Sequence, residues 1–327
     1  MLHNDLNIAQ SKQPGFLMNV PFSLSTEFPN NAWMLDLEPD ELVIDKEKTL
    51  SQFMSLYSFM SRYAVVYLLP SVPGLQDQTY VANLGIVLPH TPEKTVVISN
   101  FYSEPRRNES EIGRDFFKLM KFSIQDAPEY FEGEADLKHI RDNVYVGAYG
   151  LRTSKNALDW FSRTFDMKVI PLLMQDEYLY HLDCCVLPLS PEHLAVCTEI
   201  VDKETLHELE KYTCIHDVSV DDAYSGLTNS IVLGKHLLCA SHIQDLSPSH
   251  EDYEYEKNKI ESVSSLCSSL GMEPVFFNLS EFCKSGALLS CLVMHLNRNN
   301  YIMGESLNEA GNVKVFQFES QQELVAL

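Results

Sequence analysis

The sequence lacks any apolar run near the roughly 18 residues that a membrane-spanning helix requires, and residues 1–12 contain no signal-peptide core. Basic residues are also scarce: the sequence contains 24 Lys and Arg but 46 Asp and Glu, which gives a net charge of −22. The electrostatic field of this negative charge repels phosphate backbones and anionic lipid headgroups. We therefore expect a cytoplasmic protein that binds neither nucleic acid nor a membrane.

Metal-ligand and disulfide spacings are absent as well. The eight cysteines all lie in the second half of the chain, without a CxxC pair or the framework of a secreted disulfide protein. The segment His207-Glu208-Leu209-Glu210 lacks the second histidine of a zinc-binding helix. We expect reduced thiols, no catalytic metal and no cofactor.

What the sequence does contain is a regular alternation of helical and strand patterns over 327 residues, 45% of them apolar. Helical periodicity predicts five helices, whose starts recur at intervals of about 46 to 62 residues: 46–62, 108–121, 154–165, 203–212 and 253–270. Short apolar runs predict strands between them: 63–69, 80–88, 95–99, 143–148, 168–173, 179–187, 194–198, 229–238, 274–278 and 287–295. The recurrence favours stacked or radially arranged α/β modules in one domain, residues 1–327, with a polar N-terminal extension and a C-terminal tail from residue 308.

Two patterns in the second half carry potential chemistry. Cys291 enters an apolar run, where a cysteine is most often an inert core residue. On an extended strand His181 and Asp183 project together, which makes them either a structural pair or an acid/base beside a cation-binding carboxylate. The same alternation places Cys185, and not Cys184, on their face.

The first half supplies further polar candidates. Glu132, Glu134 and Asp136 place three carboxylates within five residues, in a turn that is typically just solvated. Arg152 closes a loop and suits capture of a carboxylate, although a surface salt bridge is the default. The remaining candidates, each of which alone indicates only a loop or a turn, are Asn31, Asn83, Arg106 and Arg107.

Taken in order, these motifs resemble the guanidino-group-modifying superfamily, the penteins, and most closely its arginine dihydrolase branch. The resemblance runs over about residues 15–297, and its most specific pieces are Phe-Glu-Gly at 131–133, Gly-Leu-Arg-Thr at 150–153, His-Leu-Asp at 181–183 and Leu-Ser-Cys-Leu at 289–292. It implies a five-module pseudo-symmetric α/β propeller of ββαβ units around a polar cavity.

The resemblance also implies roles. Cys291 would be the nucleophile, His181 the general acid/base, and Glu132 and Asp183 the carboxylates that hold a guanidinium. Arg152, assisted by Arg106 or Arg107, would bind the substrate's α-carboxylate. Many relatives have Glu-Gly-Gly-Asp, whereas here one extra residue separates Glu132 from Asp136, so Glu134 stays open as the catalytic acid.

Asn83 and Asn31 bear on the substrate. Deiminases carry an aspartate at the position of Asn83, and an amide pairs equally with a cationic guanidinium and a neutral ureido group. The implied reaction is therefore hydrolysis of arginine to ornithine, ammonia and carbon dioxide. Alternatives are a dimethylarginine hydrolase, an arginine deiminase, an amidinotransferase, or a non-catalytic propeller that binds a cationic partner. A homodimer stays open.

Overall fold

The computed structural model describes residues 11–301, and five three-stranded sheets make up its β-structure. In spatial order the strands are β15 (Met294–His295), β1 (Gly15–Asn19) and β2 (Val65–Leu69); β3 (Gly85–Leu88), β4 (Thr95–Ile98) and β5 (Ser123–Asp126); β6 (Leu137–Arg141), β7 (Val144–Tyr149) and β8 (Lys168–Leu173); β9 (Val186–Ser190), β10 (His193–Val196) and β11 (Cys214–Asp217); and β12 (Ile231–Leu233), β13 (His236–Ala240) and β14 (Glu273–Phe277). In every sheet the first pair of strands is antiparallel and the second is parallel.

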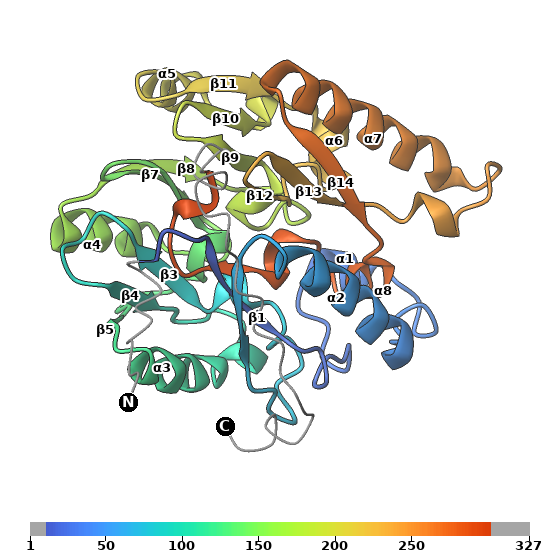
Figure 1. Ribbon diagram of the computed structural model, residues 1–327, viewed down its shortest axis with the longest axis horizontal. Coiled ribbons are helices and arrows are strands. Elements are labelled where there is room, and N and C mark those ends of the chain that lie inside the picture. The colour runs from blue at the N-terminus through green and yellow to red at the C-terminus, as the bar shows by residue number, and fades with distance from the viewer. Residues whose placement is uncertain (1–10, 302–327) are drawn as a thin grey trace.

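A long helix connects the parallel strands of each sheet, and these helices lie around the periphery of the molecule (Figure 1). They are α2 (Lys46–Met60), α3 (Glu109–Leu119), α4 (Lys155–Phe165), α5 (Lys203–Glu210) and α7 (Glu251–Leu270). Side chains of Asp45, Ser154 and Asp202 cap α2, α4 and α5 by accepting from backbone N–H groups of the first turn. Shorter helices are α1 (Ala32–Leu35), α6 (Val220–Tyr224) and α8 (Ser280–Cys283). The five-module α/β propeller expected from the sequence is confirmed.

Burial on both faces of each sheet explains why most strands read as continuous apolar runs. Along β4, Val96 and Ile98 belong to the cluster shared with the first sheet, whereas Val97 faces the third module. Each peripheral helix therefore packs between its own sheet and the sheet of the preceding module. The last of these clusters joins β12 and β13 to α2, which closes the ring.

The first strand of each sheet lies at the centre. Contacts link β15 to β3, β6 to β9, and β9 to β12. The first sheet is assembled from both ends of the described chain, because β15 pairs with β1, at Leu17 opposite Met294 and Phe16 opposite His295. Polar residues gathered at one end of these inner strands are consequently brought to a common place.

Several predicted strands are corrected by the structure. The runs 80–88, 179–187 and 287–295 each contain a 3₁₀ helix that precedes the strand, namely η2 (Val81–Asn83), η5 (Leu182–Cys184) and η8 (Ser290–Leu292). The run 229–238 is a hairpin, β12 and β13, that turns at Gly234, whose φ is +59°. Strands β1, β5, β6 and β11 were not predicted. The predicted tail from residue 308 and most of the N-terminal extension lie outside the described residues.

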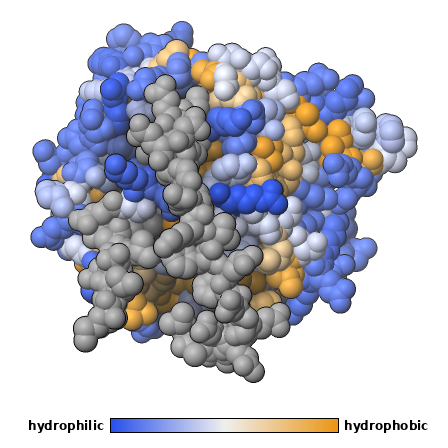
Figure 2. Space-filling model, in the orientation of Figure 1, coloured by the Kyte–Doolittle hydropathy of each residue, from blue (hydrophilic) through white to orange (hydrophobic). Residues whose placement is uncertain are grey.

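The surface agrees with the charge of the sequence. Hydrophilic side chains dominate the visible face outside a few apolar patches (Figure 2). Among residues 11–301, no helix is long and apolar enough to cross a membrane.

Candidate active site

The candidate residues lie on short turns that precede the inner strands. Four 3₁₀ helices, η2, η4 (Gly133–Ala135), η5 and η8, each begin four residues before the first strand of a sheet. Asn83 lies on η2, Asp183 on η5 and Cys291 on η8, while Glu132 and His181 are the residues that precede η4 and η5. The pseudo-symmetry of the fold thus delivers residues far apart in sequence to one end of the central ring.

His181 is buried and held from two sides. Its Nδ1 lies 2.9 Å from Oδ1 of Asp136, and its Nε2 lies 3.2 Å from Nδ2 of Asn83 and 3.4 Å from Oε2 of Glu132. Asp136 is fixed in turn by the hydroxyl of Thr153, which donates to Oδ2 at 2.6 Å. Because a carboxylate only accepts, Nδ1 carries the proton, which leaves Nε2 as the atom that exchanges protons.

Glu132 is fully buried, and its two oxygens differ. Oε1 accepts backbone hydrogen bonds from Tyr102 at 3.1 Å and Ser103 at 3.3 Å. Oε2 has no hydrogen-bond partner among the described residues, and Nη1 of Arg152 lies 3.7 Å away. A buried carboxylate oxygen without a donor is costly, so this oxygen is a ready acceptor for the N–H groups of a cation.

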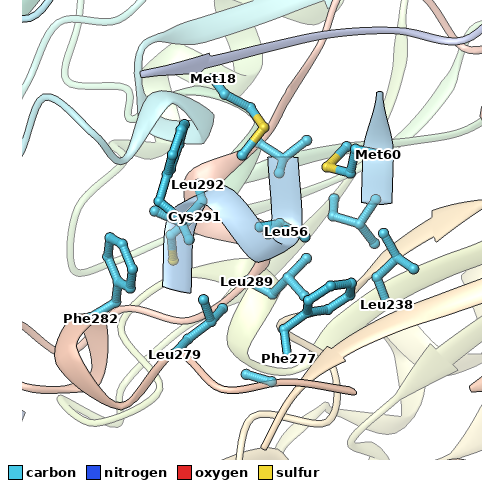
Figure 3. Close-up of a cluster of buried hydrophobic side chains, with 14 of the residues drawn as sticks. Met18, Leu56, Met60, Leu238, Phe277, Leu279, Phe282, Leu289, Cys291 and Leu292 are labelled. Atoms are coloured by element: carbon cyan, nitrogen blue, oxygen red, sulfur yellow. The ribbon is translucent and has the colours of Figure 1, made fainter. Parts of the chain in front are cut away.

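Cys291 is buried on the edge of an apolar cluster that includes Leu279, Phe282 and Leu292 (Figure 3). Burial, together with the negative charge of Asp183, raises the pKa of its thiol to about 12. Nδ2 of Asn229 donates to the sulfur at 3.5 Å. In the absence of a bound cation the thiol is therefore protonated at neutral pH.

Asp183 and Asn229 are both tied to the residue before Cys291. The hydroxyl of Ser290 donates to Oδ2 of Asp183 at 2.6 Å, and the backbone N–H of Ser290 donates to Oδ1 of Asn229 at 2.9 Å. The thiol, its neighbouring carboxylate and an amide are consequently fixed relative to one another by one residue of η8.

The loop before Cys291 is fastened to the N-terminal loop. Nδ2 of Asn31 donates to the carbonyl of Ser285 at 3.0 Å, and its Oδ1 caps α1 by accepting from Met34. A Cβ on Gly286, which has a φ of +71°, would lie 2.5 Å from Oδ1 of Asn31. The carbonyl of Gly286 accepts from the hydroxyl of Tyr180. Asn31 therefore contacts the backbone of the loop that leads to Cys291.

The three arginines have different surroundings. Arg152 lies over the ring of Tyr180, 4.9 Å from its centroid, and donates to the carbonyl of Asn30 at 2.6 Å. Arg106 is buried in a bidentate pair with Glu109 and also donates to backbone carbonyls, so four of its contacts serve the fold. Arg107 is exposed. The structure brings Arg152, but not Arg106 or Arg107, into direct contact with Glu132.

The carboxylates at 132 and 134 have separate partners. Glu134 binds Nδ1 of His295 at 2.8 Å and Nη2 of Arg298 at 3.0 Å. Burial alone would raise the pKa of Glu134, but the charges of His295 and Arg298 lower this pKa to about 2. Glu132, and not Glu134, is the carboxylate that faces His181.

Sequence reasoning misplaced one cysteine and overlooked two polar residues. Because 182–184 is a 3₁₀ helix and not a strand, Cys184 lies 3.9 Å from Asp183, while Cys185 packs in the core against Met174. Neither Asp136, as the partner of His181, nor Asn229 was identified. Asn229 lies two residues before β12, as Asn83 lies two residues before β3, so alignment of the modules would have found it.

The fold and this arrangement of thiol, imidazole and carboxylates define a pentein of the guanidino-modifying class. The family model described as "N,N dimethylarginine dimethylhydrolase, eukaryotic" matches residues 20–244, and the chain belongs to this family. The resemblance to the penteins, with arginine dihydrolases among the relatives, is confirmed.

Curated relatives include both dihydrolases and a dimethylargininase. The bifunctional arginine dihydrolase/ornithine cyclodeaminase ArgZ of Synechocystis is 29% identical over 181 residues, which are 54% of this chain and 25% of the relative. The dimethylarginine dimethylaminohydrolase of Mycobacterium tuberculosis is 22% identical over 289 residues, covering 86% of this chain and 85% of the relative. The match to ArgZ thus spans a quarter of that protein's length.

Solved structures show the same fold. The N-terminal domain of ArgZ bound to product superposes with a TM-score of 0.75 at 23% identity and covers 87% of this chain and 97% of that domain. The adduct of dimethylarginine dimethylaminohydrolase with 4-chloro-2-hydroxymethylpyridine gives a TM-score of 0.61 at 15% identity, covering 86% and 99%.

Proposed function

We propose that this chain hydrolyses the guanidinium group of arginine, through Cys291, to ornithine, ammonia and carbon dioxide. The observation that carries the proposal is the buried Oε2 of Glu132, which lacks a hydrogen-bond donor among the described residues and faces Nε2 of His181. A planar cation that donates N–H groups satisfies this oxygen, and arginine presents such a cation.

The chemistry follows from the charges around the sulfur. Glu132 and Asp183 hold the guanidinium, whose positive charge lowers the pKa of Cys291 from its raised value and favours the thiolate at the moment of attack. The thiol proton passes to Nε2 of His181, the sulfur bonds to the central carbon, and Nε2 gives this proton to the nitrogen that leaves as ammonia. Nε2 of His181 then takes a proton from the water that attacks the carbon, and the bond between carbon and sulfur breaks to release the sulfur, to which the proton returns.

Asn83 supports a second round on the product. After the first hydrolysis the guanidinium has become a neutral ureido group, which an anion at this position would hold less well than the cation. The amide of Asn83 contacts Nε2 of His181 directly and can pair with either group. A second attack by Cys291 on the ureido carbon expels the remaining ammonia, and a second water then displaces the sulfur to give a carbamate, which breaks down to carbon dioxide and ornithine.

Arg152 is proposed to bind the α-carboxylate of the substrate. Its guanidinium is only about one-tenth exposed, and it contacts Glu132 at 3.7 Å, so it lies at the border of the proposed guanidinium site. Arg106 has its donors engaged by Glu109 and by two backbone carbonyls. We assign Arg106 to the support of η2 and retain Arg152 as the substrate ligand.

The deciding experiment is incubation with arginine, citrulline, agmatine and methylated arginines, with separate measurement of ammonia, methylamines and amino acids. Two ammonia and one ornithine per arginine are expected, with Cys291→Ser inactive. Citrulline without ornithine would contradict the two-step reaction. Asn83→Asp provides a matched variant, and we expect it to accumulate citrulline.

The second candidate is hydrolysis of dimethylarginine, which the family model favours. Release of dimethylamine from dimethylarginine at a higher kcat/KM than ammonia from arginine would establish it. Amidinotransfer predicts a product only with an added amine acceptor. Binding of a cationic partner without turnover, unchanged by Cys291→Ser, would instead indicate a non-catalytic propeller.

All eight cysteines are free thiols, which supports the proposal of a reducing, cytoplasmic location. The homodimer stays a prediction, and light scattering of the purified chain tests it.

A further inference from the structure

A second cluster of potential ligands lies on the fourth sheet, apart from the candidate active site. His193 on β10 stands opposite Cys214 on β11 in the parallel register, and Cys214 and His216 are two residues apart on the same strand. All three side chains therefore project from one face. Their ligand atoms lie within 4.8 Å of one another, and Nε2 of His216 is 3.0 Å from Nδ1 of His193.

The neighbouring residues explain why this face holds the cluster. Leu194 and Ile215, which alternate with it, point to the opposite face and pack against α5. Ala195 shares the face of the cluster and is buried between this sheet and the α7 module. Cys214 is exposed and the two histidines are half-buried, so an ion reaches the cluster from solvent.

We propose that His193, Cys214 and His216 form a zinc site. Two imidazoles and a thiolate are borderline and soft ligands, which suit Zn²⁺ far better than Mg²⁺ or Ca²⁺. In a tetrahedral site with bonds of 2.0 to 2.3 Å, ligand atoms lie roughly 3.3 to 3.7 Å apart, so small side-chain rotations bring these three into place. Water completes the fourth position.

Each proton that zinc displaces from the three ligands has a destination. The thiol of Cys214 loses its proton to solvent when the sulfur bonds to the metal. The N–H shared between the two imidazoles moves to the other ring nitrogen of the same residue, so both histidines bind as neutral ligands. The metal replaces the hydrogen bond between His216 and His193 and joins β11, the edge strand of its sheet, to β10.

The sequence gives no signal for this zinc site, because its spacings show neither two histidines on one helix nor a CxxC pair. The three ligands come from two strands that α5 separates in the sequence, and the register of those strands brings them together. The inference does not depend on the reaction proposed for Cys291.

The test uses the full chain carrying Cys291→Ser, because Cys291 and His181 also offer a thiol and an imidazole. After treatment with a chelator, zinc is titrated in competition with a chromophoric chelator, and iodoacetamide labelling of each cysteine is followed by mass spectrometry. One zinc per chain is expected, with Cys214 protected from labelling.

Variants separate this site from adventitious binding. Cys214→Ser and His216→Ala are expected to weaken zinc binding by about 100-fold. Cys214→His is expected to retain binding, and the control Cys283→Ser, which removes a half-buried thiol elsewhere in the fold, to leave it unchanged. Unfolding midpoints of the metal-free variants verify that they fold. Equal zinc affinity in the parent and in Cys214→Ser, or labelling of Cys214 that zinc does not slow, would overturn the proposal.

Discussion

Asp183→Asn tests how the charge beside Cys291 controls the thiol. In the free protein, burial and Asp183 raise the pKa of Cys291 to about 12, compared with an ordinary value of 9.0. At pH 7 the thiolate fraction is then on the order of 10⁻⁵, about a thousandfold below that of an unperturbed thiol, since each pKa unit is a factor of ten. The amide keeps the shape of the carboxylate and its contact with Ser290 but removes the negative charge.

The substitution is expected to lower the pKa of Cys291 while leaving it above 9, because burial persists. Each unit of lowering makes alkylation of Cys291 about tenfold faster at pH 7. Turnover of arginine should change in the opposite direction and fall by about 10²-fold or more, because the variant loses a carboxylate that we propose to hold the guanidinium. Faster alkylation together with slower turnover distinguishes this role from simple damage to the site.

The assay is iodoacetamide labelling at several pH values, read by mass spectrometry of the peptide that contains Cys291. Cys283 serves as a reference in the same sample: burial raises its pKa to about 11, and the charges that act on it most are those of Lys259, Glu256 and Glu281. Its labelling should be identical in both proteins. The reasoning is refuted if Cys291 of the unsubstituted protein titrates below pH 9, or if Asp183→Asn slows its alkylation.

Three further substitutions test the supports of the site. Asp136→Asn should reduce kcat by about 10²- to 10⁴-fold with a smaller change in KM, because His181 loses the partner that fixes its proton on Nδ1. An unchanged pH profile of kcat would argue against this role of Asp136. Glu134→Gln should destabilise the fold by about 3 kcal/mol at pH 7 by urea unfolding, through loss of a buried ion pair. Because the folded-state pKa of Glu134 is lowered from 4.5 to about 2, that difference should shrink as the pH falls through this window. Gly286→Ala should lower stability and activity more than Gly271→Ala. Both glycines have positive φ, but only at Gly286 would the added Cβ meet another side chain, that of Asn31. Equal unfolding free energies of the two variants would show that the contact between Gly286 and Asn31 does not constrain this loop.

The helices were predictable because their apolar stripe has the period of an amphipathic helix, and those at 154–165 and 203–212 were placed within two residues of α4 and α5. The 3₁₀ helices were not, because η2, η5 and η8 are only three residues long and lie in the same largely apolar runs as the strands that follow them. Alternation along a presumed strand consequently exchanged the positions of Cys184 and Cys185. The apolar pattern of a run indicates which residues are buried, but it does not show where a strand begins.

The site was predictable only in part, for a related reason. Glu132, His181 and Cys291 were selected together through the resemblance to penteins, and the structure places Glu132 beside His181. Asp136 and Asn229 carry no local signal, since an aspartate or asparagine in a turn is ordinary. Their significance arises from contacts across 45 and 62 residues of sequence, with His181 and Cys291 respectively.

The position of Cys291 on η8, three residues before β15, ties the candidate site to the C-terminal strand. Since β15 completes the first sheet by pairing with β1, the sulfur reaches its place only when that strand has joined the N-terminal one. A chain that stops before η8 therefore carries Glu132 and His181 but lacks the thiol of the candidate site.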